Sequence, residues 1–79
     1  MKHFHVEYRN PDGHETILNS VPAKTAQAAI ENAIRAAGYT GFRYVWTQGY
    51  GFDYPAGKRP AMPVYSNGKD FIHAIAWTI

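Results

Sequence analysis

The sequence predicts an α+β fold, in which a mostly antiparallel β-sheet of order β-β-α-β-β-β carries a single helix packed on one face. Three observations predict it. Apolar and polar side chains alternate along several short segments, as they do in half-buried strands. One central segment has the period of an amphipathic helix, and turn sequences separate the segments. With only 79 residues, the chain is expected to form a single domain over residues 1–79.

The first segment predicts a β-hairpin. Residues 3–9 alternate in polarity, with Phe4, Val6 and Tyr8 on the apolar side. Residues 10–13 read Asn-Pro-Asp-Gly, in which proline presets φ and glycine accepts the left-handed conformation. A second strand from about Glu15 to Ala23 then returns alongside the first.

The next segment predicts a helix of about thirteen residues. Thr25 is a suitable N-cap, and Gly38 suits the position after the C-cap. Apolar residues recur between them at intervals of three and four, which forms one stripe along a helix. These residues are Ala26, Ala29, Ile30, Ala33, Ile34 and Ala37. Because the stripe consists mostly of alanine, we expect the sheet to approach the helix closely.

A third strand is predicted where Phe42, Tyr44 and Trp46 alternate with smaller or polar residues. Large side chains are what close packing against an alanine-rich helix requires. We therefore expect these three aromatic residues to lie in the core beneath the helix.

The alternation continues past Gln48, and this continuation predicts a binding segment. An extended stretch over residues 42–54 would be about 40 Å long, whereas a helix of thirteen residues is only about 20 Å long. Its distal half is therefore expected to extend beyond the core. Exposed aromatic residues among glycines, next to two cations, suit protein interfaces. The predicted partner-binding residues are Tyr50, Phe52, Tyr54, Lys58 and Arg59.

A second hairpin is predicted at the end of the chain. Residues 55–60 contain two prolines and predict a loop. Asn67 and Gly68 then stand between two apolar runs, a strong hairpin pattern. The last strand is expected from about Asp70 to Ile79.

The amino-acid composition limits the functional classes to which the chain can belong. The chain contains no cysteine, which favours a reducing, cytoplasmic setting, and no apolar run is long enough to predict an export or membrane segment. Eight lysine and arginine residues against six acids give a net charge of +2, spread along the chain. A dedicated nucleic-acid binder normally has a denser basic stripe.

No pattern predicts catalysis, a cofactor or a metal site, so we do not expect an enzyme. His3 and His5 share a strand face, and with His14 or His73 they are candidates for a three-histidine metal site, but solvated or partner-facing histidines are the preferred interpretation. We expect His73 to be a half-buried, hydrogen-bonded imidazole. The two serines and six carboxylates form no triad or acid pair.

The layout resembles that of small phage-encoded proteins, among them anti-CRISPR proteins that inhibit multi-subunit type I systems. The resemblance is carried by the initial hairpin, by residues 21–30 (VPAKTAQAAI), by residues 39–45 (YTGFRYV) and by the aromatic β terminus. It implies a cytoplasmic inhibitor active in host-defence evasion. Such a protein binds a subunit of the interference complex or its recruited nuclease and blocks access to it.

The function expected from the sequence is therefore that of a small protein-binding inhibitor whose partner is a host protein complex. Two alternatives remain open. The same aromatic segment would suit a small nucleic-acid-binding module, in which bases stack on the rings. An exposed aromatic edge would also suit a homodimer interface.

Overall fold

The computed structural model describes residues 1–48 and 60–79, and these form five strands and one helix. In chain order the elements are β1 (Lys2–Arg9), β2 (Glu15–Ala23), α1 (Ala26–Ala36), β3 (Arg43–Thr47), β4 (Pro63–Ser66) and β5 (Phe71–Thr78). The α+β class and the predicted order of elements are confirmed.

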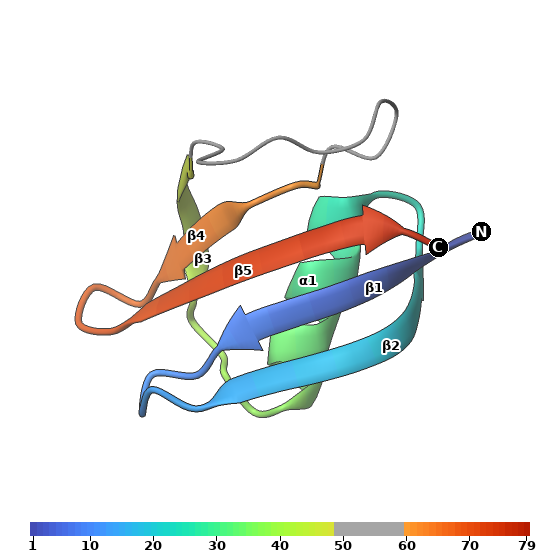
Figure 1. The fold of residues 1–79 in the computed structure, drawn as a ribbon. Helices are drawn as coiled ribbons and strands as arrows, with labels where there is room; N and C mark the ends of the chain where they lie inside the picture. Colours follow the sequence, from blue (N-terminus) through green and yellow to red (C-terminus); the bar gives the residue numbers. More distant parts are fainter. Residues whose placement is uncertain (49–59) are drawn as a thin grey trace.

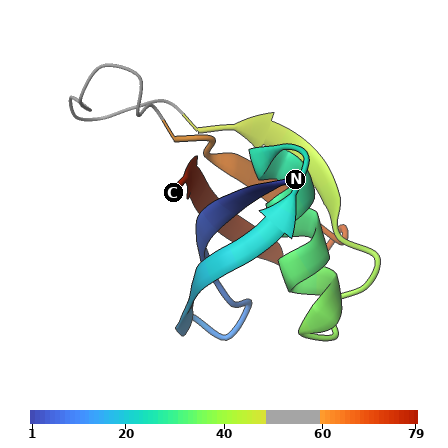
Figure 2. The ribbon, with the colours of Figure 1, turned by 90° about the vertical axis from the view of Figure 1, so that its right-hand side faces the viewer.

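The five strands form one antiparallel sheet in the order β2-β1-β5-β4-β3. The long strand β5 lies at the centre, between β1 and β4, while β2 and β3 form the two edges (Figure 1). The helix lies on one side of this sheet, as the view at a right angle shows (Figure 2). It packs against β1, β2 and β5.

Local turn chemistry sets both hairpins. In the first turn the amide of Gly13 donates to the Asn10 carbonyl over 2.9 Å, and Gly13 has a φ of +94°. In the turn between β4 and β5 the amides of Lys69 and Asp70 donate to Asn67 Oδ1 over 2.9 and 2.7 Å. The first turn is closed by a main-chain bond and the second by the side-chain oxygen of Asn67, and both predicted turns are confirmed.

The predicted caps of the helix are confirmed. Thr25 is extended and its side chain accepts a hydrogen bond from the amide of Ala28 over 3.1 Å. At the other end Gly38 has a φ of +94°, and the amides of Gly38 and Tyr39 donate to the carbonyls of Arg35 and Ile34. These two bonds satisfy carbonyls that the end of a helix leaves without partners. In the part of the chain that the structure describes, no helix is long and apolar enough to cross a membrane.

The hydrophobic core lies between α1 and the face of the sheet turned toward it. Alternate residues of β1 and β5 enter it together with four residues of the helix and with Tyr65 of β4. Its buried strand residues include Phe4, Val6, Tyr8, Tyr65, Ile72, Ala74 and Ala76, and its helix residues are Ala29, Ile30, Ala33 and Ile34. Tyr65 is fully buried, and its hydroxyl donates to Glu31 Oε2 of α1 over 3.3 Å.

The expectation that Tyr44 and Trp46 lie in the core is wrong. Their side chains are 46% and 44% exposed, while Phe42 is partly buried against the core. One reason is position, because β3 is an edge strand and the helix packs against β1, β2 and β5. The other is a bulge: Tyr44 pairs with Tyr65, but Trp46 pairs with the adjacent Val64. Tyr65 and Val64 are neighbours in β4 and so face opposite sides of the sheet. Tyr44 and Trp46, which pair with them, therefore also face opposite sides, although they are two residues apart in β3.

The N-cap can be tested by substitution. Replacing Thr25 with alanine removes the acceptor for the Ala28 amide, so we expect Thr25→Ala to lower the free energy of unfolding by about 1 kcal/mol. Thr25→Ser keeps a hydroxyl at the cap and should remain close to the native stability. Urea unfolding followed by circular dichroism measures both. Equal losses in the two variants would show that the hydroxyl does not cap the helix.

Stability at high pH tests the contact between Tyr65 and Glu31. Burial, followed by the neighbouring Glu31 carboxylate, raises the pKa of Tyr65 above its usual range. Above about pH 10 an unfolded tyrosine loses its proton while the folded Tyr65 keeps it. The unfolded state then binds fewer protons, so the free energy of unfolding falls as the pH rises. Tyr65→Phe should lose about 1 kcal/mol at neutral pH and show a shallower alkaline decline. Urea unfolding between pH 7 and 11 measures this, and an unchanged decline would contradict it.

Candidate functional site

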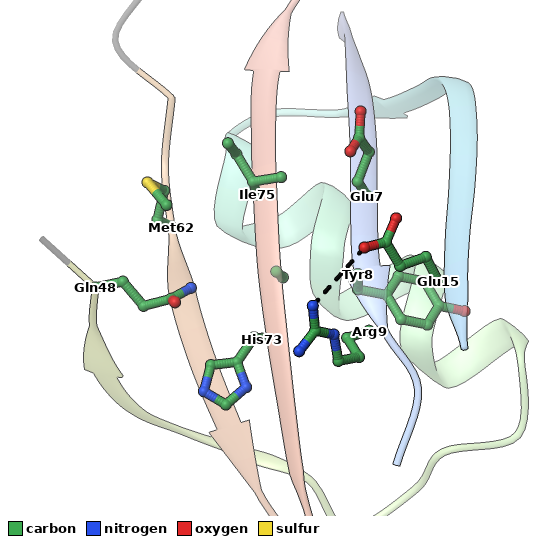
Figure 3. A pocket seen from close by; sticks show the side chains of 9 residues that line it. Glu7, Tyr8, Arg9, Glu15, Gln48, Met62, His73 and Ile75 are labelled. Carbon is green, nitrogen blue, oxygen red and sulfur yellow. Dashed lines mark ion pairs between the residues drawn. The ribbon is translucent and has the colours of Figure 1, made fainter. Parts of the chain in front are cut away.

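The face of the sheet turned away from α1, termed the outer face, carries the candidate site. Alternation along β1, β2, β4 and β5 places its residues there, and the bulge in β3 turns Trp46 to the same side, where it pairs with Val64. Figure 3 shows several of them in front of the sheet with the helix behind it. Its apolar and histidine side chains are His3 and His5 of β1, Ile17 of β2, Trp46 of β3, Val64 of β4, and Phe71, His73, Ile75 and Trp77 of β5.

Three ring side chains form the centre of this site and are termed the Trp46 cluster: Trp46, Phe71 and His73. The Trp46 ring lies 5.8 Å from that of Phe71 and 6.4 Å from the imidazole of His73, in tilted and edge-on arrangements. These are favourable geometries for aromatic pairs. Trp46 and Phe71 are 44% and 47% exposed, and His73 is exposed as well. The cluster therefore presents large aromatic surface to solvent from two strands.

Val64 supports the cluster from within the sheet. It pairs with Trp46 on one side and with His73 on the other, so it lies between them on the outer face. Although it does not belong to the core cluster beneath the helix, Val64 is fully buried. The Trp46 cluster thus has a buried apolar residue, Val64, between its members Trp46 and His73, and all three residues belong to strands.

A second aromatic contact lies further along the same face. The imidazole of His5 stacks on Trp77 with ring centroids 4.3 Å apart and planes 20° apart. Its Nε2 lies 2.6 Å from Glu7 Oε2, which fixes the orientation of the imidazole. His5 and Trp77 are both partly buried.

The charges on the strands of the outer face cancel. The negative charges of Glu7 and Glu15 balance the positive charges of Arg9 and Arg43. Arg9 and Glu15 form a loose ion pair of 3.8 Å in which both side chains are largely exposed. With neutral histidines, the strands present no net charge on this face.

A shallow depression of about 260 Å³ lies beside the Trp46 cluster. His73 and Ile75 of β5 line it together with Arg9, Gln48 and Met62 (Figure 3). This volume is below the range of about 300–1,000 Å³ that is typical of small-molecule pockets. It is large enough for a single side chain.

The structure corrects the prediction for His73 and places the other histidines. His73 is exposed on the outer face and not half-buried, because Ile72 and Ala74 on either side of it point into the core. His3 and His5 alternate with buried Phe4 and so share the outer face. His14 lies in the first turn, 3.2 Å from Asp12. Among the described residues no three histidine, cysteine or acidic side chains are grouped to hold a metal ion.

The residues predicted to bind a partner, Tyr50, Phe52, Tyr54, Lys58 and Arg59, lie outside the described residues. The continuation of the third strand past Gln48 lies outside them as well. What sequence reasoning missed is the outer face. The pattern that could have revealed it is in β5, where Phe71, Ile75 and Trp77 are apolar on the side opposite its small buried residues. A strand that is apolar on both sides indicates that both faces of its sheet make contacts.

Comparisons with family models, with curated proteins and with solved structures found no match. The candidate site therefore rests on its own geometry: an exposed aromatic cluster on a charge-balanced sheet face.

The exposure of Trp46 can be tested by fluorescence. We expect Trp77→Phe, in which Trp46 is the remaining tryptophan, to be quenched more strongly by acrylamide than Trp46→Phe, in which Trp77 remains. The reason is that Trp46 is exposed, whereas Trp77 is partly buried against His5. Stern–Volmer plots of the two folded variants give the comparison. Stronger quenching of Trp77 would place Trp46 in the core, as the sequence alone suggests.

Proposed function

We propose that this domain is a small protein-binding inhibitor that docks its outer face on a larger protein. The observation that carries the proposal is the Trp46 cluster, in which Trp46 and Phe71 remain nearly half exposed on adjacent parts of a rigid sheet. Exposed aromatic clusters of this kind mark interaction sites more often than they serve folding.

The cluster has the properties of an interface centre. Tryptophan is among the side chains that contribute most to binding energy, and such residues gather near the middle of an interface. Trp46 and Phe71 each have only two rotatable side-chain bonds and already contact one another, so little conformational entropy is lost on docking. The charged side chains of Arg9, Glu15 and Arg43 lie around the cluster, as polar residues do at an interface rim.

Charge favours a protein partner over a nucleic acid. Bases would stack on Trp46 and Phe71, but a nucleic-acid surface also needs cations that follow the phosphates. On the strands of the outer face, Arg9 and Arg43 are balanced by Glu7 and Glu15. A face without net charge attracts a backbone of phosphates weakly.

A type I interference complex or its nuclease is the first partner to test, because of the resemblance in layout to anti-CRISPR proteins. The balanced face does not imitate the charge of nucleic acid. Inhibition would therefore come from occupying a protein surface that the complex or the nuclease needs. No catalytic step is part of this proposal.

The test combines a binding measurement with a cellular one. Wild-type protein is expected to bind the purified interference complex or its nuclease and to restore phage plaques on a host with an active type I system. Trp46→Ala/Phe71→Ala should weaken binding by about 30-fold or more, since a single hot-spot residue contributes about 2 kcal/mol. It should also abolish plaque formation.

Gln27→Ala is the control. Gln27 is exposed on α1, which lies on the side of the sheet opposite the outer face (Figure 2), so its loss should leave binding intact. Full inhibition by a folded Trp46→Ala/Phe71→Ala variant would exclude the outer face. Binding to single-stranded RNA or DNA that weakens steeply with salt would instead identify a nucleic-acid module. Dimers that the double substitution dissociates would identify a homodimer interface.

A further inference from the structure

The sheet has a free edge at β2, on the side of the fold remote from the Trp46 cluster. β2 pairs with β1 along one side, and along its other side it forms no ladder with a strand in the described part of the chain. A row of N–H and C=O groups on such an edge is a template for another strand. In the stretch Glu15–Leu18 the pairing with β1 is regular, and the irregularity comes between Leu18 and Val21.

An apolar groove lies beside this edge and is lined by residues of β2 and α1. Its volume is about 620 Å³, more than twice that of the depression on the outer face. Leu18 and Val21 line it from β2, while Ala33 and Ala36 line it from the helix and Ala37 from its C-cap. The groove exists because the helix presents methyl groups where larger side chains would fill the space.

The electrostatics of the groove select the chemistry of an occupant. Among the described residues no aspartate, glutamate, lysine or arginine lines it, and its polar side chains are those of Tyr8, Thr16, Ser20 and Asn32. A charged group placed there would lose its hydration without finding a partner charge. The groove therefore accepts uncharged, apolar side chains and excludes a phosphate or an acidic segment.

The adjoining edge selects the conformation of the occupant. A helix has already satisfied its own backbone groups, whereas an extended chain matches the free N–H and C=O groups of β2. We propose that β2 accepts an extended peptide segment as a sixth strand, and that apolar side chains at alternate positions of this segment fill the groove against α1. Main-chain hydrogen bonds give such complexes affinity, and the pocket for alternate side chains gives them specificity.

A second copy of this chain fits the same edge less well than a peptide does. Pairing the full length of β2 with β2 of another copy would bring two irregular stretches and two Pro22 residues into one ladder. Proline has no N–H to donate, and bulges interrupt strand pairing. A short peptide needs only the regular stretch Glu15–Leu18.

The experiment is a nuclear magnetic resonance titration of the full chain with a synthetic probe. The probe is an acetylated, amidated hexapeptide. Its first and last residues are lysines for solubility, and its four central residues alternate between valine and threonine. We expect amide shifts and slowed hydrogen exchange in residues 15–18, together with methyl shifts at Leu18 and Ala36. The same peptide with N-methylated amides on its pairing edge should bind at least tenfold more weakly, because it lacks the donors.

Two variants separate the groove from the rest of the molecule. Ala36→Glu places a charge in the groove at an exposed helix position, and should weaken binding of the probe at least tenfold. Thr40→Glu adds the same charge outside the groove and should leave binding unchanged. Trp46→Ala should also leave binding of the probe unchanged. A failure of the β2-edge proposal is therefore distinguishable from a failure of the outer-face proposal.

Three results would overturn the inference. They are the absence of shifts along β2 at millimolar probe, shifts that N-methylation leaves intact, and binding that Ala36→Glu does not weaken. Concentration-dependent dimers with protected β2 amides in the absence of probe would likewise overturn it, in favour of a second copy.

Discussion

The organisation of this molecule depends on one constraint, which is that a single short helix covers a sheet wider than itself. Eleven residues make a helix about 16 Å long and about 10 Å across, while five strands spaced by about 4.8 Å extend over about 19 Å. The helix packs on β1, β2 and β5 and seals the core there. Everything beyond its reach, including Trp46 on β3 and the whole outer face, must find other contacts or remain exposed.

The parts of the fold that the sequence predicts well are those decided by a few adjacent residues. Thr25 and Gly38 mark the ends of the helix because each satisfies groups within one turn of itself. Asn67 and Gly68 do the same for the last hairpin. The order of strands and the bulge in β3 depend on residues far apart in the chain, so local patterns do not reveal them. The sequence pattern therefore predicts Trp46 in the core, whereas the bulge turns Trp46 to the side of the sheet opposite to Tyr44.

The candidate site was less predictable than the fold, for a related reason. Sequence patterns mark β5 as apolar on both sides, but they do not tell which side the helix covers. Only the pairing of Val64 with Trp46 and His73 brings residues 46, 71 and 73 together. The segment that sequence reasoning favoured, around Tyr50 and Arg59, lies outside the described residues, and its role stays a prediction.

Under the proposed function the Trp46 cluster would serve both folding and binding, because Trp46 pairs with a buried residue. Val64 beneath it is fully buried, so Trp46 contributes some burial to the folded state even without a partner. The exposed parts of Trp46 and Phe71 contribute no hydrophobic burial to the folded domain, and under the proposed function they would become buried when the partner docks. If the outer face docks as proposed, a substitution at Trp46 is expected to change stability and binding together, whereas one at Phe71, which is outside the Val64 pairing, is expected to change mainly binding. This difference makes Phe71 the sharper probe of the outer face.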